Sequence, residues 1–228
     1  MTQGRCNYCG GLYSKAGMTK HLASCEQRKA VVNAKKGERK NYLRIIAQDR
    51  YLSDYWMHLK VLDETTLNGL DFFLRDIWVE CCGHASIFTI GGVNYCSFED
   101  RFFLEDENMN FRLCDILGAG MKFRYWYDFG STTELILRVV GGIQEVPKGE
   151  PIQIMARNKA PQYTCEVCGA EATQVCCQCI YKDEGWVCER CAAQHGCGED
   201  MLLPVVNSPR VGICGYCGSS STADYSPV

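Results

Sequence analysis

The stretch CERCAAQHGC, Cys188 to Cys197, places three cysteines and one histidine within ten residues. Thiolate sulfur and imidazole nitrogen are ligands that zinc binds well in proteins. The whole chain has 17 cysteines and only four histidines, so possible ligands are concentrated here. Whether these side chains form disulfides, attack a substrate or hold a metal decides how this part of the chain folds.

Composition favours metal over disulfides. No stretch of the sequence approaches the roughly 18 apolar residues of a membrane-spanning helix, and the first residues, MTQGRCNYCGG, lack the apolar run of a secretory signal. We therefore expect a cytoplasmic protein. Disulfides do not persist in a reducing cytoplasm, and an odd number of cysteines cannot pair completely.

The region around the opening stretch contains four ligand pairs, enough for two zinc ions. The first and third pairs are separated by nineteen residues, which fits the zinc-site template C-x2-C-x15–20-C-x2-C. Sequential pairing, or Cys177 in place of Cys176, is the alternative. The interleaved arrangement, which resembles the cross-braced B-box, ZZ and MYND modules, assigns one ion to Cys165, Cys168, Cys188 and Cys191, and the other to Cys176, Cys179, His195 and Cys197.

A third zinc ion is expected near the start of the chain, where Cys6 and Cys9 precede His21 and Cys25. A compact finger over residues 1–26 cannot bury enough surface to fold unaided, whereas zinc binding contributes about 10–16 kcal/mol. The alternative is that some of these thiols are simply buried. Four protein ligands leave no position for water or substrate, so we expect all three zinc ions to be structural.

Charge divides the chain into a basic head and an acidic body. Residues 1–50 hold 11 Lys and Arg against 3 Asp and Glu, and the other residues hold 13 against 24. Such a head can bind phosphates without regard to sequence, although a solvated linker is the alternative. The candidate nucleic-acid residues are Lys15, Lys20, Arg28, Lys29, Lys35, Lys36, Arg39 and Lys40. Ser14, Gly17 and Lys20 would occupy the base-contacting positions of the finger. Base reading is not expected, because glycine has no side chain with which to contact a base edge.

The remaining pattern predicts an α+β fold with a mostly antiparallel sheet and packed helices over residues 51–160. A strand is expected in DYWMHLKVL, a helix after Thr65 or Thr66, a hairpin around Gly91 and Gly92, and strands in MKFRYWYDF, ELILRVV and PIQIMAR. Around this domain we expect a basic linker or helix at 27–50, the two-zinc module at 161–217 and a disordered tail at 218–228.

Two further cysteine motifs have no obvious partner. CCGH, Cys81 to His84, follows the predicted helix, and packing or a helix end at Gly83 is its simplest explanation. Cys214-x2-Cys217 is half of a zinc site whose second half is not visible in the sequence. A catalytic site using Cys82, His84 or Asp128 is an alternative hypothesis, which would require these three side chains to lie together in a pocket.

The segments LDFFLRDIWVECCGHASIF (residues 70–88) and YWYDFGSTTELILRVV (residues 125–140) resemble the plasmid pRiA4b ORF-3-like family, also described as insertion-element passenger proteins. LLPVVNSPRVGICGY (residues 202–216) is similar to a zinc-containing branch of that family. Many members have Asp, Trp and His after Tyr-Asp-Phe-Gly, where this chain has Ser131, Thr132 and Thr133. The resemblance implies a prokaryotic α+β domain without an established activity, often encoded near mobile elements or host-defence genes.

Together these features predict a non-enzymatic protein with three zinc ions. Its basic head would associate with nucleic acid, and its acidic body would contact a protein partner. The alternatives are a pure protein–protein adaptor and an enzyme with a site in the middle domain.

Overall fold

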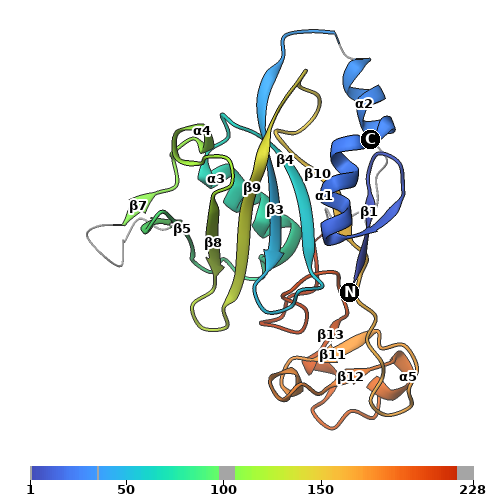
Figure 1. The fold of residues 1–228 in the computed structure, drawn as a ribbon. Helices are drawn as coiled ribbons and strands as arrows, with labels where there is room; N and C mark the ends of the chain where they lie inside the picture. Colours follow the sequence, from blue (N-terminus) through green and yellow to red (C-terminus); the bar gives the residue numbers. More distant parts are fainter. Residues whose placement is uncertain (1, 35, 98–105, 220–228) are drawn as a thin grey trace.

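The computed structural model describes residues 2–34, 36–97 and 106–219 (Figure 1). Most of the tail that was predicted to be disordered, residues 220–228, lies outside the described residues. A large sheet with helices forms the body, and a smaller cysteine-rich module lies at one end of it.

The large sheet has ten strands in the order β2-β1-β10-β4-β3-β9-β8-β5-β6-β7. Every neighbouring pair is antiparallel except β6 and β7, which confirms the predicted α+β class with a mostly antiparallel sheet. The strands are β1 Gln3–Cys6, β2 Leu12–Ser14, β3 Lys40–Asp49, β4 Trp56–Leu62, β5 Ser86–Ile90, β6 Val93–Cys96, β7 Glu107–Asn108, β8 Lys122–Tyr127, β9 Thr133–Glu145 and β10 Ile152–Asn158.

Strand β3 corrects the sequence analysis. Helix α2 spans Glu26–Asn33, but Lys40–Asp49 forms a central strand between β4 and β9. The prediction of a basic linker or helix over 27–50 is therefore wrong for residues 40–49. The reason is that Ile45 and Ala47 face the core while Arg44 and Gln48 alternate with them, a two-residue period that the flanking basic residues obscure.

Helix α3, Leu67–Leu74, and its continuation η1, Arg75–Val79, cover one face of the sheet. Thr66 begins α3 as predicted, since its hydroxyl accepts a hydrogen bond from the Gly69 backbone N–H at 3.2 Å. Leu67, Leu70 and Trp78 then enter a core completed by the inward side chains of the strands and by the short helix α4, Leu113–Ile116. Burial of these apolar side chains holds α3 and η1 against this inner face of the sheet.

The predicted hairpin and strands are also present. Gly91 and Gly92 join β5 to β6 with φ angles of 59° and 90°, a conformation that glycine adopts without the steric cost of a Cβ atom. The four sequence segments expected to form strands correspond to β4, β8, β9 and β10.

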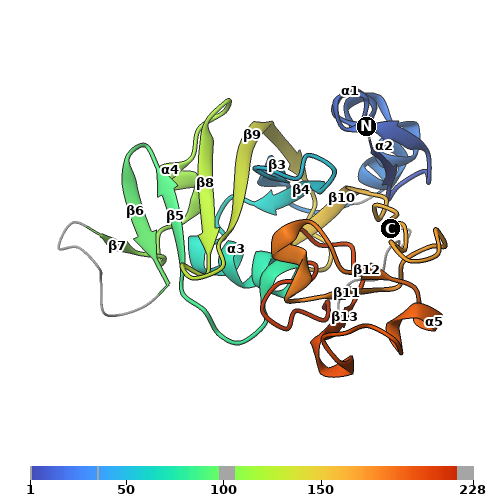
Figure 2. The same ribbon diagram turned by 90° about the horizontal axis from the view of Figure 1, so that it is seen from below.

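Helix α1, Lys15–Ser24, lies on the opposite face of the sheet near β10 (Figure 2). Its Met18 and Leu22 pack against Trp56 and Met155 of the sheet, and β1 pairs directly with β10. The N-terminal finger is thus joined to the sheet by both side-chain packing and backbone hydrogen bonds.

The cysteine-rich module contains a second sheet, ordered β12-β11-β13. Its elements are β11 Gln174–Cys176, η2 Cys179–Lys182, β12 Trp186–Val187, α5 Glu189–Ala192, η3 Glu199–Met201 and β13 Leu202–Pro204. Val175 and Leu203 join the core of the body, and the Tyr163 hydroxyl lies 2.8 Å from that of Tyr55. The module is therefore docked against the α3 side of the sheet (Figure 2).

A buried charge group connects α2 to the sheet. Glu145 is 1% exposed, and its carboxylate pairs with Lys60 Nζ at 2.7 Å and Arg28 Nη1 at 2.9 Å. We expect Glu145→Gln to lower the free energy of unfolding by about 3–5 kcal/mol, because buried Lys60 and half-buried Arg28 lose their counter-charge. Urea unfolding followed by circular dichroism measures this loss.

The control for that substitution is Glu64→Gln. Glu64 pairs with Lys40 at a similar distance of 2.8 Å, but both side chains are exposed. Its removal should change the free energy of unfolding far less, because solvent screens an exposed pair. Equal losses for the two variants would contradict the role assigned to burial.

Candidate metal centres

The structure brings together four groups of cysteine and histidine whose potential ligand atoms lie within 4.8 Å of one another. Three of them contain the residues predicted from the sequence, in the interleaved arrangement, and the fourth was not predicted. The groups are Cys6, Cys9, His21 and Cys25; Cys165, Cys168, Cys188 and Cys191; Cys176, Cys179, His195 and Cys197; and Cys81, Cys82, His84 and Cys214.

The N-terminal group is built from a turn and a helix. Cys6 ends β1 and Cys9 follows in the turn, while His21 lies on α1 and Cys25 ends that helix. The Cys9 Sγ to His21 Nε2 distance is 3.3 Å. Tyr13 stacks on the His21 ring with 4.0 Å between centroids, which fixes the direction of the imidazole.

The two groups of the cysteine-rich module alternate along the chain. Cys168 and Cys188 have sulfurs 3.6 Å apart in one group, and Cys179 and Cys197 have sulfurs 3.7 Å apart in the other. A tetrahedral zinc ion with bonds of about 2.3 Å holds its sulfurs about 3.8 Å apart. The donor types and their spacing therefore fit zinc.

Backbone geometry supports thiolate ligands in this module. Backbone N–H groups, first that of Cys188, point at the Cys165 sulfur and lower the pKa of its thiol to about 6. Gly185 has a φ of 97°, and a Cβ atom there would lie 2.7 Å from Cys179 Cβ. Only glycine fits where the chain passes so close to this ligand.

Cys177 does not take the place of Cys176. The Cys176 side chain belongs to the ligand group, whereas Cys177 Sγ lies 3.8 Å from Met201 Sδ and packs against the main core. Adjacent residues of a strand point to opposite sides, so only one of the two thiols can reach the group.

The unpredicted group joins the two motifs that the sequence left without partners. Cys82 Sγ lies 3.8 Å from Cys214 Sγ, and His84 Nε2 lies 3.0 Å from the first sulfur and 3.3 Å from the second. Of the two motifs, Cys214-x2-Cys217 was interpreted from the sequence as half of a zinc site, whereas CCGH was interpreted as packing or a helix end. Their partnership was not predicted, because 131 residues separate Cys82 from Cys214.

The catalytic alternative requires Cys82, His84 and Asp128 to lie together. They do so here, because Asp128 Oδ2 lies 3.5 Å from His84 Nε2. In a catalytic triad the carboxylate holds one imidazole nitrogen while the other nitrogen faces the nucleophile. Here a single nitrogen faces both thiols and the carboxylate. The neighbouring Cys81 thiol also raises the pKa of Cys82 to about 11, the reverse of nucleophile activation. The arrangement matches ligation better than catalysis.

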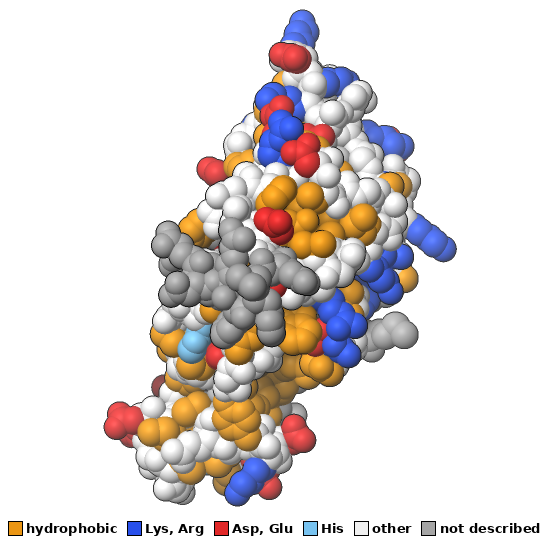
Figure 3. Space-filling view, turned by 90° about the vertical axis from the view of Figure 1, so that its left-hand side faces the viewer, with side chains coloured by type: hydrophobic (Ala, Val, Ile, Leu, Met, Phe, Trp, Pro, Cys, Tyr) orange, Lys and Arg blue, Asp and Glu red, His pale blue; other side chains and the backbone are white. Residues whose placement is uncertain are grey.

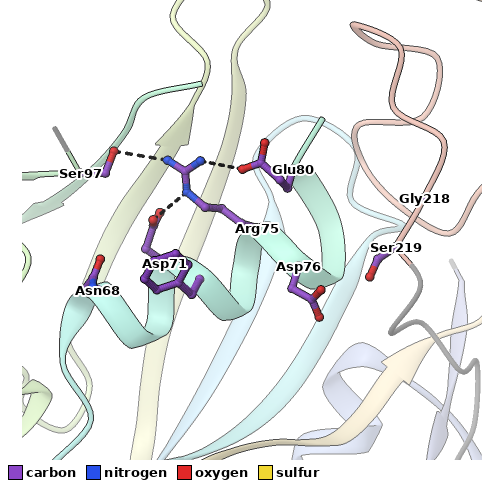
Figure 4. A pocket seen from close by; sticks show the side chains of 9 residues that line it. Asn68, Asp71, Arg75, Asp76, Glu80, Ser97, Gly218 and Ser219 are labelled. Carbon is purple, nitrogen blue, oxygen red and sulfur yellow. Dashed lines mark hydrogen bonds and ion pairs between the residues drawn. The ribbon is translucent and has the colours of Figure 1, made fainter. Parts of the chain in front are cut away.

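A pocket of about 490 Å³ lies beside this group (Figure 4). Its one arginine, Arg75, is fully engaged: Nε donates to Asp71 and Nη1 to Glu80, both at 2.7 Å, and Nη2 donates to the His84 carbonyl at 2.7 Å. Asp76 adds a further negative charge to the lining. The pocket is thus unsuited to an anion, and its ion pairs fix the chain that carries His84.

The residues predicted to bind nucleic acid differ in their contacts within the protein. Arg28 forms an ion pair with buried Glu145, and Arg39 donates a hydrogen bond to the Gln144 carbonyl. Lys29 and Lys40 form surface ion pairs, while Lys20 and Lys36 are exposed. Lys35 lies outside the described residues. Lys15 is half-buried on α1 beside the sheet, where burial lowers the pKa of its ammonium group. Four of the eight predicted residues are therefore engaged by other groups of the protein, namely Arg28, Lys29, Arg39 and Lys40.

The four groups give this chain the donor set of a zinc-binding protein. Comparisons with protein-family models and with curated proteins find no match. The chain is similar to the crystal structure of MM3350, a protein of unknown function from Methanosarcina mazei Go1, with a TM-score of 0.44 and 14% identity over 57% of this chain and 75% of that chain. This distant similarity gives no information on function.

Membrane insertion has no support from the helices. Within residues 2–34, 36–97 and 106–219, none combines the length and the apolar character that crossing a bilayer requires.

Replacing Cys188 by Ser should remove one zinc ion and unfold the module locally. The affected group ties α5 to the loop before β11, and the nearby Tyr163 and Trp186 rings stack with 3.6 Å between centroids. Native mass spectrometry should show one zinc ion fewer, and tryptophan fluorescence should report loss of the stack.

Cys177→Ser is the matched control, because Cys177 lies in the same module but outside both groups. It should keep the full zinc content. A Cys188→Ser protein with unchanged zinc content, or loss of zinc from the control, would contradict the ligand assignment.

Proposed function

We propose that this protein is a non-enzymatic zinc-binding protein that binds single-stranded nucleic acid, without sequence preference, on the open face of its large sheet. Zinc in the three groups predicted from the sequence would be structural, because each ion would have four protein ligands. The observation that carries the nucleic-acid proposal is a pair of adjoining cationic hollows, together called the groove, on the sheet face opposite α3.

The groove consists of two adjoining hollows. One, of about 280 Å³, lies between α1 and the outer face of β3, β9 and β8, and the other, of about 440 Å³, lies over β8 and the β5–β6 turn. They share Lys122 and Ile136. The described residues that line them include four cations and no carboxylate, and the cations are Lys15, Lys122, Arg124 and Arg138.

The cations of the groove have few partners within the protein. Lys122 stands directly opposite Arg138 in the pairing of β8 with β9, and like charges in that position destabilise a sheet. Of the four, Arg124 has an ion pair, with Glu134 at 3.7 Å, and Glu134 is bound more closely by Arg50 at 2.7 Å. A phosphate chain along the groove would relieve this repulsion.

An aromatic side chain completes the groove. Trp126 lines the second hollow and is half-buried, and its buried Nε1 has no hydrogen-bond partner in the part of the chain that the structure describes. A base stacked on such a ring contributes about 1–3 kcal/mol and needs no particular sequence. Cations beside an aromatic platform are the arrangement by which single strands are bound.

The basic head contributes to this surface through Lys15 of α1. The finger itself is poorly suited to reading bases, because the Ser14 hydroxyl caps α1 by accepting a hydrogen bond from Gly17 N–H. Figure 3 shows Lys and Arg side chains along its right-hand edge, which corresponds to the sheet face seen from the front in Figure 1. Nucleic acid would therefore lie across the sheet rather than along the segment before it.

A protein-partner role is the second candidate, favoured by two large side chains of the cysteine-rich module. Val167 and Tyr181 are 72% and 63% exposed. They lie in the module and apart from the groove, so a protein partner there would leave the sheet face accessible. A pure adaptor would use this surface alone.

We also propose that residues 51–160 belong to the plasmid pRiA4b ORF-3-like family. The support is the quoted pair of segments, which form α3 to β5 and β8 to β9, the helix and strands around the main core. A cytoplasmic protein linked to mobile elements or host defence is the corresponding biological setting.

Charge reversal in the groove tests the nucleic-acid proposal. Lys122→Glu with Arg138→Glu should weaken binding of a labelled single-stranded oligonucleotide at least about tenfold. It should also reduce the slope of log K against log salt by about 1.4, since two phosphate contacts are lost. Fluorescence anisotropy at several salt concentrations measures both quantities.

Lys148→Glu with Lys182→Glu, both exposed and away from the groove, is the charge-matched control and should change binding little. Lys29→Glu with Lys36→Glu tests the basic head. Loss of binding only in that last variant would place the interface on the head instead, and absence of binding by the unaltered protein would leave the adaptor role.

A further inference from the structure

We propose that Cys81, Cys82, His84 and Cys214 form a fourth zinc site, which fastens the C-terminal segment to the middle domain. Three of its residues follow η1, and the fourth arrives from the far end of the chain. Cys81 Sγ lies 3.7 Å from Cys82 Sγ, which in turn lies 3.8 Å from Cys214 Sγ. This inference does not depend on the nucleic-acid proposal.

The sulfur–sulfur distances are those of a tetrahedral zinc site. Such an ion holds two sulfurs about 3.8 Å apart and a sulfur and a nitrogen about 3.6 Å apart. The two measured sulfur–sulfur distances agree closely with the first value, and the sulfur–nitrogen distances of 3.0 and 3.3 Å are shorter than the second. His84 directs one nitrogen, Nε2, toward both Cys82 and Cys214, as a metal ligand does.

The chain that carries the first three ligands is held in place by its own contacts. The Glu80 carboxylate accepts hydrogen bonds from the Gly83 N–H at 2.5 Å and the Tyr127 hydroxyl at 2.9 Å. Arg75 fixes both the Glu80 side chain and the His84 carbonyl, as Figure 4 shows for the first of these contacts. Preorganisation of this kind lowers the entropic cost of closing a metal site.

Cys214 has a strained backbone. Its φ of 49° lies in the left-handed region, which a side chain other than glycine or asparagine seldom adopts. Strain of this kind persists where surrounding contacts enforce it, and it is concentrated at functional positions. At Cys214 it turns the thiol toward Cys82 and His84.

A buried cation also lies beside the ligands of such a site. Zinc with three thiolates and a neutral imidazole carries one net negative charge. Arg210 is fully buried, and its Nη2 lies 3.4 Å from Cys81 Sγ and 2.6 Å from Asp128 Oδ2. One guanidinium thus serves a ligand sulfur and the carboxylate beside His84, as outer contacts of metal sites commonly do.

Cys217 is the obvious competitor for the fourth ligand, because Cys214-x2-Cys217 has the spacing of a zinc knuckle. Its thiol instead donates to the Gly215 carbonyl at 3.3 Å, and it lies outside the group of converging ligand atoms. The geometry selects Cys81.

The site would complete an attachment already made by other contacts. In the same segment the Ser208 hydroxyl donates to the Trp78 carbonyl at 2.5 Å, and Arg210 Nη1 donates to the Ser131 carbonyl at 2.9 Å. A zinc ion at Cys214 would anchor the end of this segment to the residues after η1. The cysteine-rich module would then be linked to the body at both of its ends.

Protection from alkylation tests the proposal in the unaltered, zinc-loaded and reduced full-length chain. Cys82 and Cys214 are exposed, as are Cys114 and Cys217, so access alone would let all four react with iodoacetamide. We expect Cys82 and Cys214 to remain unmodified until a chelator is added, while Cys114 and Cys217 react at once. Peptide mass spectrometry identifies the modified residues. Prompt alkylation of Cys82 and Cys214 in protein that retains three zinc ions would overturn the proposal.

Metal stoichiometry supplies an independent test by native mass spectrometry. The unaltered chain should hold four zinc ions, Cys214→Ser and Cys81→Ser three, and Cys217→Ser and Cys114→Ser four. A stoichiometry of three in the unaltered chain would refute the site, and loss of zinc from Cys217→Ser with retention in Cys81→Ser would refute its ligand set. Oligonucleotide binding is measured separately with Cys214→Ser. Failure of the fourth zinc site can then be distinguished from failure of the nucleic-acid proposal.

Discussion

The buried guanidinium of Arg210 is the interaction through which the parts of this molecule meet. It donates to Asp128 after β8, to Thr133 and Ser131 at the start of β9, and to Cys81 after η1. A fully buried cation requires a counter-charge, which the Asp128 carboxylate supplies at 2.6 Å from Nη2. Arg210 therefore fixes the C-terminal segment against the body by pairing with the Asp128 carboxylate.

The two faces of the large sheet have different physical roles because of what covers them. The inner face is sealed by α3, η1 and the cysteine-rich module, and it carries the apolar core. On the outer face α1 covers the region near β10, while β8 and β9 present charged and aromatic side chains. Stability is thus concentrated on one side, which leaves the other side available for recognition.

Local spacing made part of this structure predictable. A Cys-x2-Cys pair fixes its own turn, so the three groups that contain Cys6, Cys165 and Cys176 could be assembled from the sequence. Strand β3 was hidden by basic residues around its apolar alternation. The group at Cys214 and the row of cations on β8 and β9 depend on strand register and on long-range docking, and neither leaves a periodic signal along the chain.

The pairing of β1 with β10 has a consequence for solubility. A sheet edge with unpaired N–H and C=O groups can recruit a strand from another molecule, and β10 would present such an edge if the finger came away. The finger instead ends the sheet with β2, a strand of three residues. A metal ion held by Cys6, Cys9, His21 and Cys25 would keep the finger in place at the edge of β10. Removal of that ion by a chelator would expose this edge and favour self-association of molecules whose body is still folded.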